Sequence, residues 1–140
     1  MLKELTYKII IITGLLPASI LLVFSFMGLS NILSSNHLIG EDIILLFSII
    51  VGIAGYIGLV TSLVIPKKTM LNFLLLLLGL IGFSIFLSME GGMHGWLWFL
   101  TIEEPDEWLL PAWPIITALI GLIVNLIRFI QNPKNKNSTP

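Results

Sequence analysis

The chain has 140 residues, of which 56% are hydrophobic and 11% are charged, and its mean hydropathy is +1.03. Because an ordinary soluble domain has about 25% charged residues, this composition excludes a soluble globule, and the short length predicts one domain. The formal net charge is −1, and the basic residues are scattered in small groups, which excludes a basic surface for nucleic acid. The absence of cysteine excludes disulfides, thiol nucleophiles and zinc–thiolate sites.

Four apolar runs dominate the sequence, each about 20 residues long and therefore able to cross the ~30 Å hydrocarbon core of a bilayer as a helix. They predict an all-α, four-helix transmembrane bundle within residues 1–130, followed by a disordered basic tail at 131–140, with helices at about 9–29, 43–65, 69–89 and 111–130. A cleaved signal peptide is the alternative interpretation of the first run. Secretory apolar regions are typically shorter, about 7–15 residues, so we expect an uncleaved helix.

The charged residues predict the orientation of this bundle. With four spans, all the basic residues fall on one side of the membrane: Lys3, Lys8, Lys67, Lys68, Arg128, Lys134 and Lys136. Every acidic residue except Glu4 falls on the other side. The positive-inside rule therefore predicts cytoplasmic termini in a bacterial inner membrane.

The second run contains small residues at spacings of 4, 3, 3 and 4, which lie on one helix face: Ser48, Gly52, Gly55, Gly58 and Ser62. Small side chains let helices approach closely in lipid, so this face predicts helix packing. Packing inside the monomer and oligomerisation through the same face both remain open. Gly79 and Gly82 of the third run suit contact with the second, and the hydroxyl of Tyr56 requires a hydrogen-bond partner.

The fourth run has a polar stripe at spacings of 4, 4 and 3, formed by Thr117, Gly121, Asn125 and Arg128. An amide within a span is costly in lipid, so we expect Asn125 to bond to another helix and the stripe to pack against the bundle. Arg128 is near enough to the end to reach the headgroups. Asn72, one turn into the third run, is expected to be solvated at the headgroups.

The segment between the third and fourth runs is rich in tryptophan and acidic residues. Tryptophan concentrates at membrane–water interfaces, and aromatic residues are also enriched in protein–protein interfaces. An interfacial anchor and a partner-binding surface are both consistent with this loop. The candidate partner-binding residues are Trp96, Trp98, Glu103, Glu104, Asp106 and Trp108.

Catalytic and metal sites find little support in the sequence. Glu90, His94, Glu103, Glu104 and Asp106 suggest a metal site only weakly, because a single histidine is local. Ser88, His94 and Asp106 lack the nucleophile elbow expected of a hydrolase triad. We expect no enzyme activity, no cofactor and no bound metal.

The predicted function is therefore binding of another membrane protein or of a membrane-directed protein, as an accessory or assembly subunit or as an immunity-type protein. The first alternative is an oligomeric channel or transporter lined by Asn125 and Thr117. No Asp, Glu or His lies within a predicted span, and this lowers the expectation of proton-coupled transport. A holin-like, membrane-active protein is the third possibility, and homo-oligomers remain open.

Overall fold

The computed structural model describes residues 2–34, 40–89, 97, 101 and 108–131. Its long elements are the helices α1 (Leu2–Ser34), α2 (Gly40–Val64), α3 (Thr69–Met89) and α6 (Trp113–Gln131), the last preceded by the single π-helical turn η1 (Trp108–Ala112). Within these described residues, four helices are long and apolar enough to cross a membrane. The described part is thus all-helical, as the sequence predicts.

Local chemistry accounts for the helix ends. Glu41 and Asp42 lie in the first turn of α2, where the helix dipole favours negative charge. Pro66 disfavours helical geometry at the residue before it, and the chain turns there, with the Lys68 amide donating to the Ile65 carbonyl at 3.2 Å. Pro111, inside η1, has no N–H to offer the helical ladder. Helix α3 has the bounds that the sequence predicts.

Helix α1 is longer than the predicted 9–29. Its 33 residues correspond to about 50 Å of helix, which exceeds the hydrocarbon core. The additional N-terminal residues, about two turns, include Glu4 and Lys8, whose side chains approach to 3.8 Å, an arrangement that supports a helix. The length of the apolar run therefore predicted only the minimum length of the helix.

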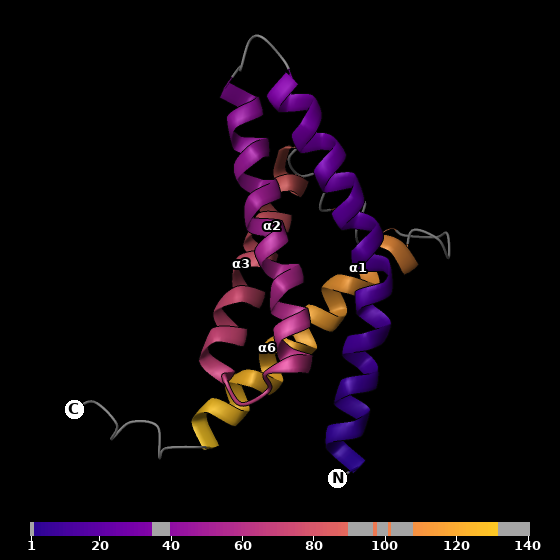
Figure 1. Cartoon of the computed structure of the whole chain (residues 1–140), viewed down its shortest axis with the longest axis vertical. Coiled ribbons are helices and arrows are strands. Elements are labelled where there is room, and N and C mark those ends of the chain that lie inside the picture. The colour runs from indigo at the N-terminus through magenta and orange to yellow at the C-terminus, as the bar shows by residue number, and fades with distance from the viewer. Residues whose placement is uncertain (1, 35–39, 90–96, 98–100, 102–107, 132–140) are drawn as a thin grey trace, which may run out of the picture.

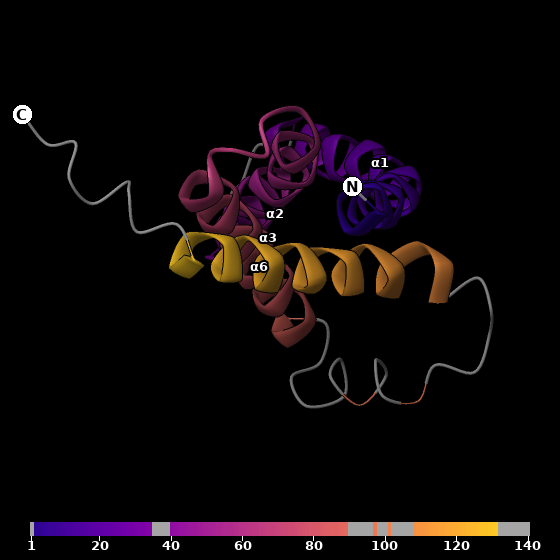
Figure 2. The ribbon, with the colours of Figure 1, turned by 90° about the horizontal axis from the view of Figure 1, so that it is seen from below.

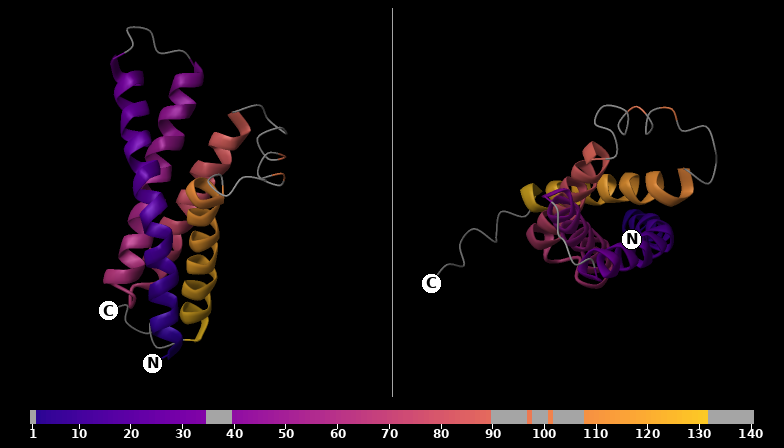
Figure 3. Two further views of the ribbon diagram at one scale, coloured as in Figure 1. Left: turned by 90° about the vertical axis from the view of Figure 1, so that its right-hand side faces the viewer. Right: turned by 90° about the horizontal axis from the view of Figure 1, so that it is seen from above.

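The helices form an uneven bundle (Figure 1). The N-terminus, the α2–α3 turn and the C-terminal end of α6 lie at one end, and the start of α2 lies at the other. We call the first the basic end, because the described basic side chains beyond Lys3 all belong to it: Lys8, Lys67, Lys68 and Arg128. Seen along the long axis, α6 is strongly inclined to the other helices (Figure 2). The C-terminal part of α3 leans away from α1 (Figure 3).

Candidate functional site

Helices α2 and α3 make the most extensive contact in the bundle, and it is a contact between backbones. A Cβ on Gly55 would meet the Cα of Gly79, and one on Gly82 would come within 2.7 Å of the Gly52 amide nitrogen. The Ser48 hydroxyl donates to the Gly82 carbonyl at 2.8 Å. These small residues therefore bring α2 against α3 within one chain, and Gly79 and Gly82 make the predicted contact with the second helix.

Gly58 continues this contact towards the basic end. A Cβ there would lie 2.9 Å from the Leu76 amide nitrogen and 3.0 Å from the Leu75 side chain. Ser62, one turn further along α2, is only 1% exposed. Gly52 differs from its neighbours, because a Cβ at that position would meet nothing within 4 Å. Its missing side chain faces open space beside the α2–α3 contact.

The polar stripe of α6 packs against α1. A Cβ on Gly14 would collide with the Thr117 side chain, so Gly14 marks the close approach of α1 and α6. Thr117 is fully buried, and its hydroxyl donates to the Pro114 carbonyl at 2.8 Å. Gly121 leaves room for Leu76 and Ile11, whose Cδ1 atoms would lie 3.0 and 3.4 Å from a Cβ there. The stripe thus faces the interior of a single chain.

Asn125 donates to side chains on two other helices. Its Nδ2 lies 3.3 Å from the Tyr7 hydroxyl of α1 and 3.5 Å from the Ser62 hydroxyl of α2, and it also donates to the Gly121 carbonyl at 2.8 Å. The Arg128 guanidinium lies over the Tyr7 ring, 4.8 Å from its centroid, a cation–π distance. Arg128 therefore contacts α1 as well as lying near the end of its own helix.

The position of Asn72 differs from the one that the sequence predicts. We expected its side chain to be solvated at the headgroups, but it is 0% exposed. Its Nδ2 donates to the Ile65 carbonyl at 3.1 Å. Leu76, one turn further along the same face of α3, packs against Gly121 of α6. Proximity to the lysines of the turn suggested solvation. The helix that packs against this face of α3 comes from a distant part of the sequence.

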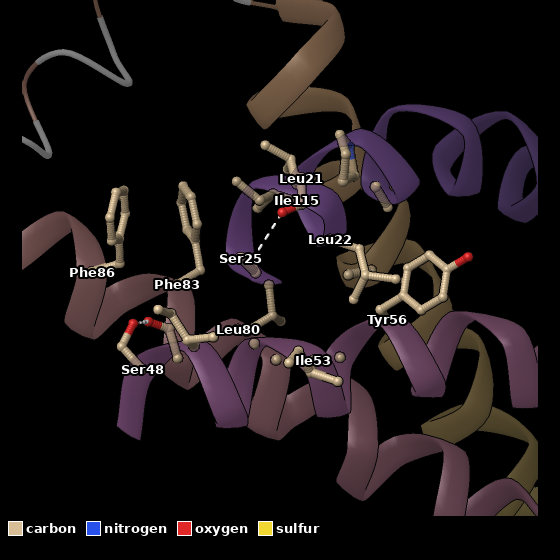
Figure 4. A pocket seen from close by; sticks show the side chains of 18 of the residues that line it. Leu21, Leu22, Ser25, Ser48, Ile53, Tyr56, Leu80, Phe83, Phe86 and Ile115 are labelled. Carbon is tan, nitrogen blue, oxygen red and sulfur yellow. Dashed lines mark hydrogen bonds between the residues drawn. The ribbon is translucent and has the colours of Figure 1, made fainter. Parts of the chain in front are cut away.

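An apolar groove of about 430 Å³ lies between α1, α2 and α3, and residues of η1 and of the start of α6 also line it. We call it the interhelical groove, and its lining includes Leu21, Ser25, Gly52, Ile53, Phe83 and Phe86. Figure 4 shows Leu80 and Phe83 of α3 facing Leu21 and Ser25 of α1 across an open space. The groove belongs to the half of the bundle away from the basic end, where α3 leans away from α1 (Figure 3).

The polar groups along this groove are largely engaged elsewhere. The Ser25 hydroxyl donates to the Leu21 carbonyl at 2.9 Å, and the Tyr56 hydroxyl lies 3.1 Å from that of Ser19, which provides the partner predicted for Tyr56. Within the described segments, charged side chains lie only at the two ends of the bundle, and no group of three His, Cys, Asp or Glu side chains could hold a metal ion. The groove therefore presents hydrocarbon, not reactive chemistry.

The predicted partner-binding residues Trp96, Trp98, Glu103, Glu104 and Asp106 lie outside the described residues, as do Glu90 and His94, and Trp108 begins η1. Trp113, at the start of α6, donates from Nε1 to the Thr13 hydroxyl of α1 at 3.2 Å.

Sequence reasoning missed Tyr7 and Gly14 as contact residues. Tyr7 stands beside Lys8 in a short polar head, a context that indicates the interface, and Gly14 is a lone glycine in an apolar run. Neither carries a spacing pattern that marks a packed face. Comparison of the chain with protein-family models, with curated proteins and with solved structures finds no match.

Proposed function

We propose that this protein is a non-enzymatic, multi-pass membrane protein that acts by binding another membrane protein or a membrane-directed protein. Its role would be that of an accessory or assembly subunit or of an immunity-type protein. The observation that carries this proposal is the interhelical groove, an apolar opening of about 430 Å³ that the described helices leave unfilled.

The occupant that we propose for the groove is an apolar helix of the partner. Helices associate in lipid through close packing at small residues, and Ser25, Gly28 and Gly52 all line the groove. A Cβ on Gly52 would meet nothing, and one on Gly28 would meet only the Ile49 Cδ1, at 3.6 Å. A partner helix thus has small residues to approach on both α1 and α2.

The groove and the tryptophan-rich loop are neighbours along the chain. Phe86 and Leu87 line the groove just before residues 90–107, and Pro111 lines it just after them. The composition of that loop, rich in tryptophan and acidic residues, supports a partner independently of the groove.

The channel alternative gains no support from the described residues. Thr117 and Asn125, the side chains expected to line an oligomeric pore, are 0% and 1% exposed within a single chain. A second copy could not reach them without opening the contact between α1 and α6. A protein that binds a partner requires no such opening.

We further propose that the basic end faces the cytoplasm of a bacterial inner membrane. The support is the gathering of Lys8, Lys67, Lys68 and Arg128 at one end, with Glu41 and Asp42 at the other. The positive-inside rule assigns such an end to the cytoplasm. The groove would then open in the half of the membrane away from the cytoplasm.

Co-purification from membranes in mild detergent tests the proposal, with a tag on the C-terminal tail. Gly52→Leu places a side chain in the groove. Gly40→Leu is the matched control, because a Cβ on Gly40 would also meet nothing within 4 Å, but Gly40 lies outside the groove lining. We expect a defined protein to be retained by wild type and Gly40→Leu and lost by Gly52→Leu.

A second variant tests the loop in the same experiment. Replacement of Trp96, Trp98, Glu103 and Glu104 by alanine is expected to lose the same protein. Recovery of an identical set of proteins with every variant, or of self-oligomers alone, would overturn the proposal. Conductance of the purified protein in liposomes would then become the leading question.

A further inference from the structure

Each of the four helices contributes one buried polar side chain at the same level of the bundle, near the basic end. On α2 and α3, Gly55 lies against Gly79 and Gly58 lies against Leu76. Four residues further along α2, and four back along α3, stand Ser62 and Asn72. Because residues four apart share a helix face, this antiparallel register places Ser62 opposite Asn72.

The register of α6 leads to the same level. Gly121 lies against Leu76 of α3 and Ile11 of α1, and one turn towards the basic end these three helices carry Asn125, Asn72 and Tyr7. Asn125 bonds to Tyr7 and to Ser62. We call the four residues Tyr7, Ser62, Asn72 and Asn125 the polar layer, and none is more than 5% exposed.

The hydrogen bonds of the polar layer are incomplete. Asn72 Oδ1 is buried and has no hydrogen-bond partner in the described part of the chain. Its amide cannot simply be reversed, because Nδ2 donates to the Ile65 carbonyl and an oxygen in that place would face another acceptor. A buried acceptor without a partner costs about 1–3 kcal/mol, and native structures contain few of them.

Donors that could satisfy this oxygen are present in the same layer. The hydroxyls of Tyr7 and Ser62 both lie within hydrogen-bond distance of Asn125 Nδ2 and share its second proton, and neither donates its own proton to a described residue. Their distances from Asn125 Nδ2, 3.3 and 3.5 Å, exceed the usual N–H···O distance of about 2.9–3.0 Å.

We propose that the polar layer binds one water molecule, which donates a hydrogen bond to Asn72 Oδ1 and accepts one from the Ser62 or Tyr7 hydroxyl. Buried waters commonly make about three hydrogen bonds to otherwise unsatisfied groups, which matches the groups available here. A metal cation is disfavoured, because the layer offers only neutral oxygens and the Arg128 guanidinium already lies over the Tyr7 ring. The water joins α3 to the polar contacts of the other three helices.

A crystal structure of the wild-type chain grown from a lipid phase tests the proposal without any variant. The expected result is a water oxygen about 2.7–3.2 Å from Asn72 Oδ1 and within hydrogen-bond distance of one of the two hydroxyls. A dry layer, or a direct bond from the Ser62 hydroxyl to Asn72 Oδ1, would overturn it.

Thermal unfolding provides an independent readout of the bridge. If the water couples Ser62 to Asn72, the decrease in Tm of the double variant Ser62→Ala/Asn72→Leu will be smaller than the two single decreases together. The control pair is Ser48→Ala with Asn72→Leu, because Ser48 bonds directly to Gly82, away from the layer. Additive decreases in both pairs would count against the bridge.

Discussion

Asn125 Nδ2 donates to the Tyr7 hydroxyl at 3.3 Å, joining residues 118 positions apart in the sequence. This bond connects α6 to α1, and the same tyrosine ring lies under the Arg128 guanidinium. Tyr7 thus holds α6 by two separate interactions, one through its hydroxyl and one through its ring. The two can be separated by substitution.

Tyr7→Phe removes the hydroxyl and keeps the ring. We expect the free energy of unfolding to fall by about 0.6–2 kcal/mol, the range measured for hydrogen bonds between helices in membrane proteins. The measurement is reversible unfolding in mixed micelles, followed by circular dichroism. Arg128→Gln should cost the same in the wild-type and Tyr7→Phe backgrounds, because the ring is unchanged. Unequal costs would show that the hydroxyl and the ring act together.

Gly55→Ala is expected to destabilise the α2–α3 contact. The added methyl meets the Gly79 backbone, which cannot rotate away, so we expect a loss of about 1–3 kcal/mol, as for other overpacked sites. Gly52→Ala is the matched control on the same helix, because its Cβ meets nothing within 4 Å. It should be neutral or slightly stabilising, since alanine favours helix over glycine. Equal unfolding curves for the two variants would contradict the close contact between Gly55 and Gly79.

Membrane orientation can be measured with single cysteines, because the chain has none of its own. We expect Glu41→Cys to react with a membrane-impermeant maleimide added to intact spheroplasts, and Lys67→Cys to react only after the membrane is permeabilised. The reason is the separation of acidic and basic residues between the two ends, which the positive-inside rule converts into an orientation. The reverse labelling pattern would contradict the proposed cytoplasmic termini.

The sequence predicted the spans because apolar length is a local property. Helix α3 coincides with its predicted range, and the spacing of Gly55 and Gly58 marks a face of α2 without any knowledge of its partner. The full length of α1 could not be predicted in this way, because a helix continues beyond the apolar run wherever local pairs such as Glu4 and Lys8 support it.

The candidate site was less accessible to sequence reasoning, since a groove depends on how helices diverge. Nothing in the residues of α3 indicates that its C-terminal part leans away from α1 (Figure 3). The face of α3 that carries Asn72 likewise packs against α6 through Leu76 and Gly121, and α6 begins more than 40 residues after Asn72. The sequence of one chain indicates which face of a helix is suited to packing. Which helix packs against that face depends on the arrangement of the whole bundle.

Photo-crosslinking in intact cells tests the central claim most directly. A benzophenone amino acid replaces Phe86, which lines the groove, or Phe47, which is 55% exposed and lies outside the groove lining on α2. Binding of a partner helix in the groove predicts an adduct with one defined second protein from position 86 and none from position 47. Adducts with lipid or with a second copy of this chain alone, or the same adducts from both positions, would contradict it.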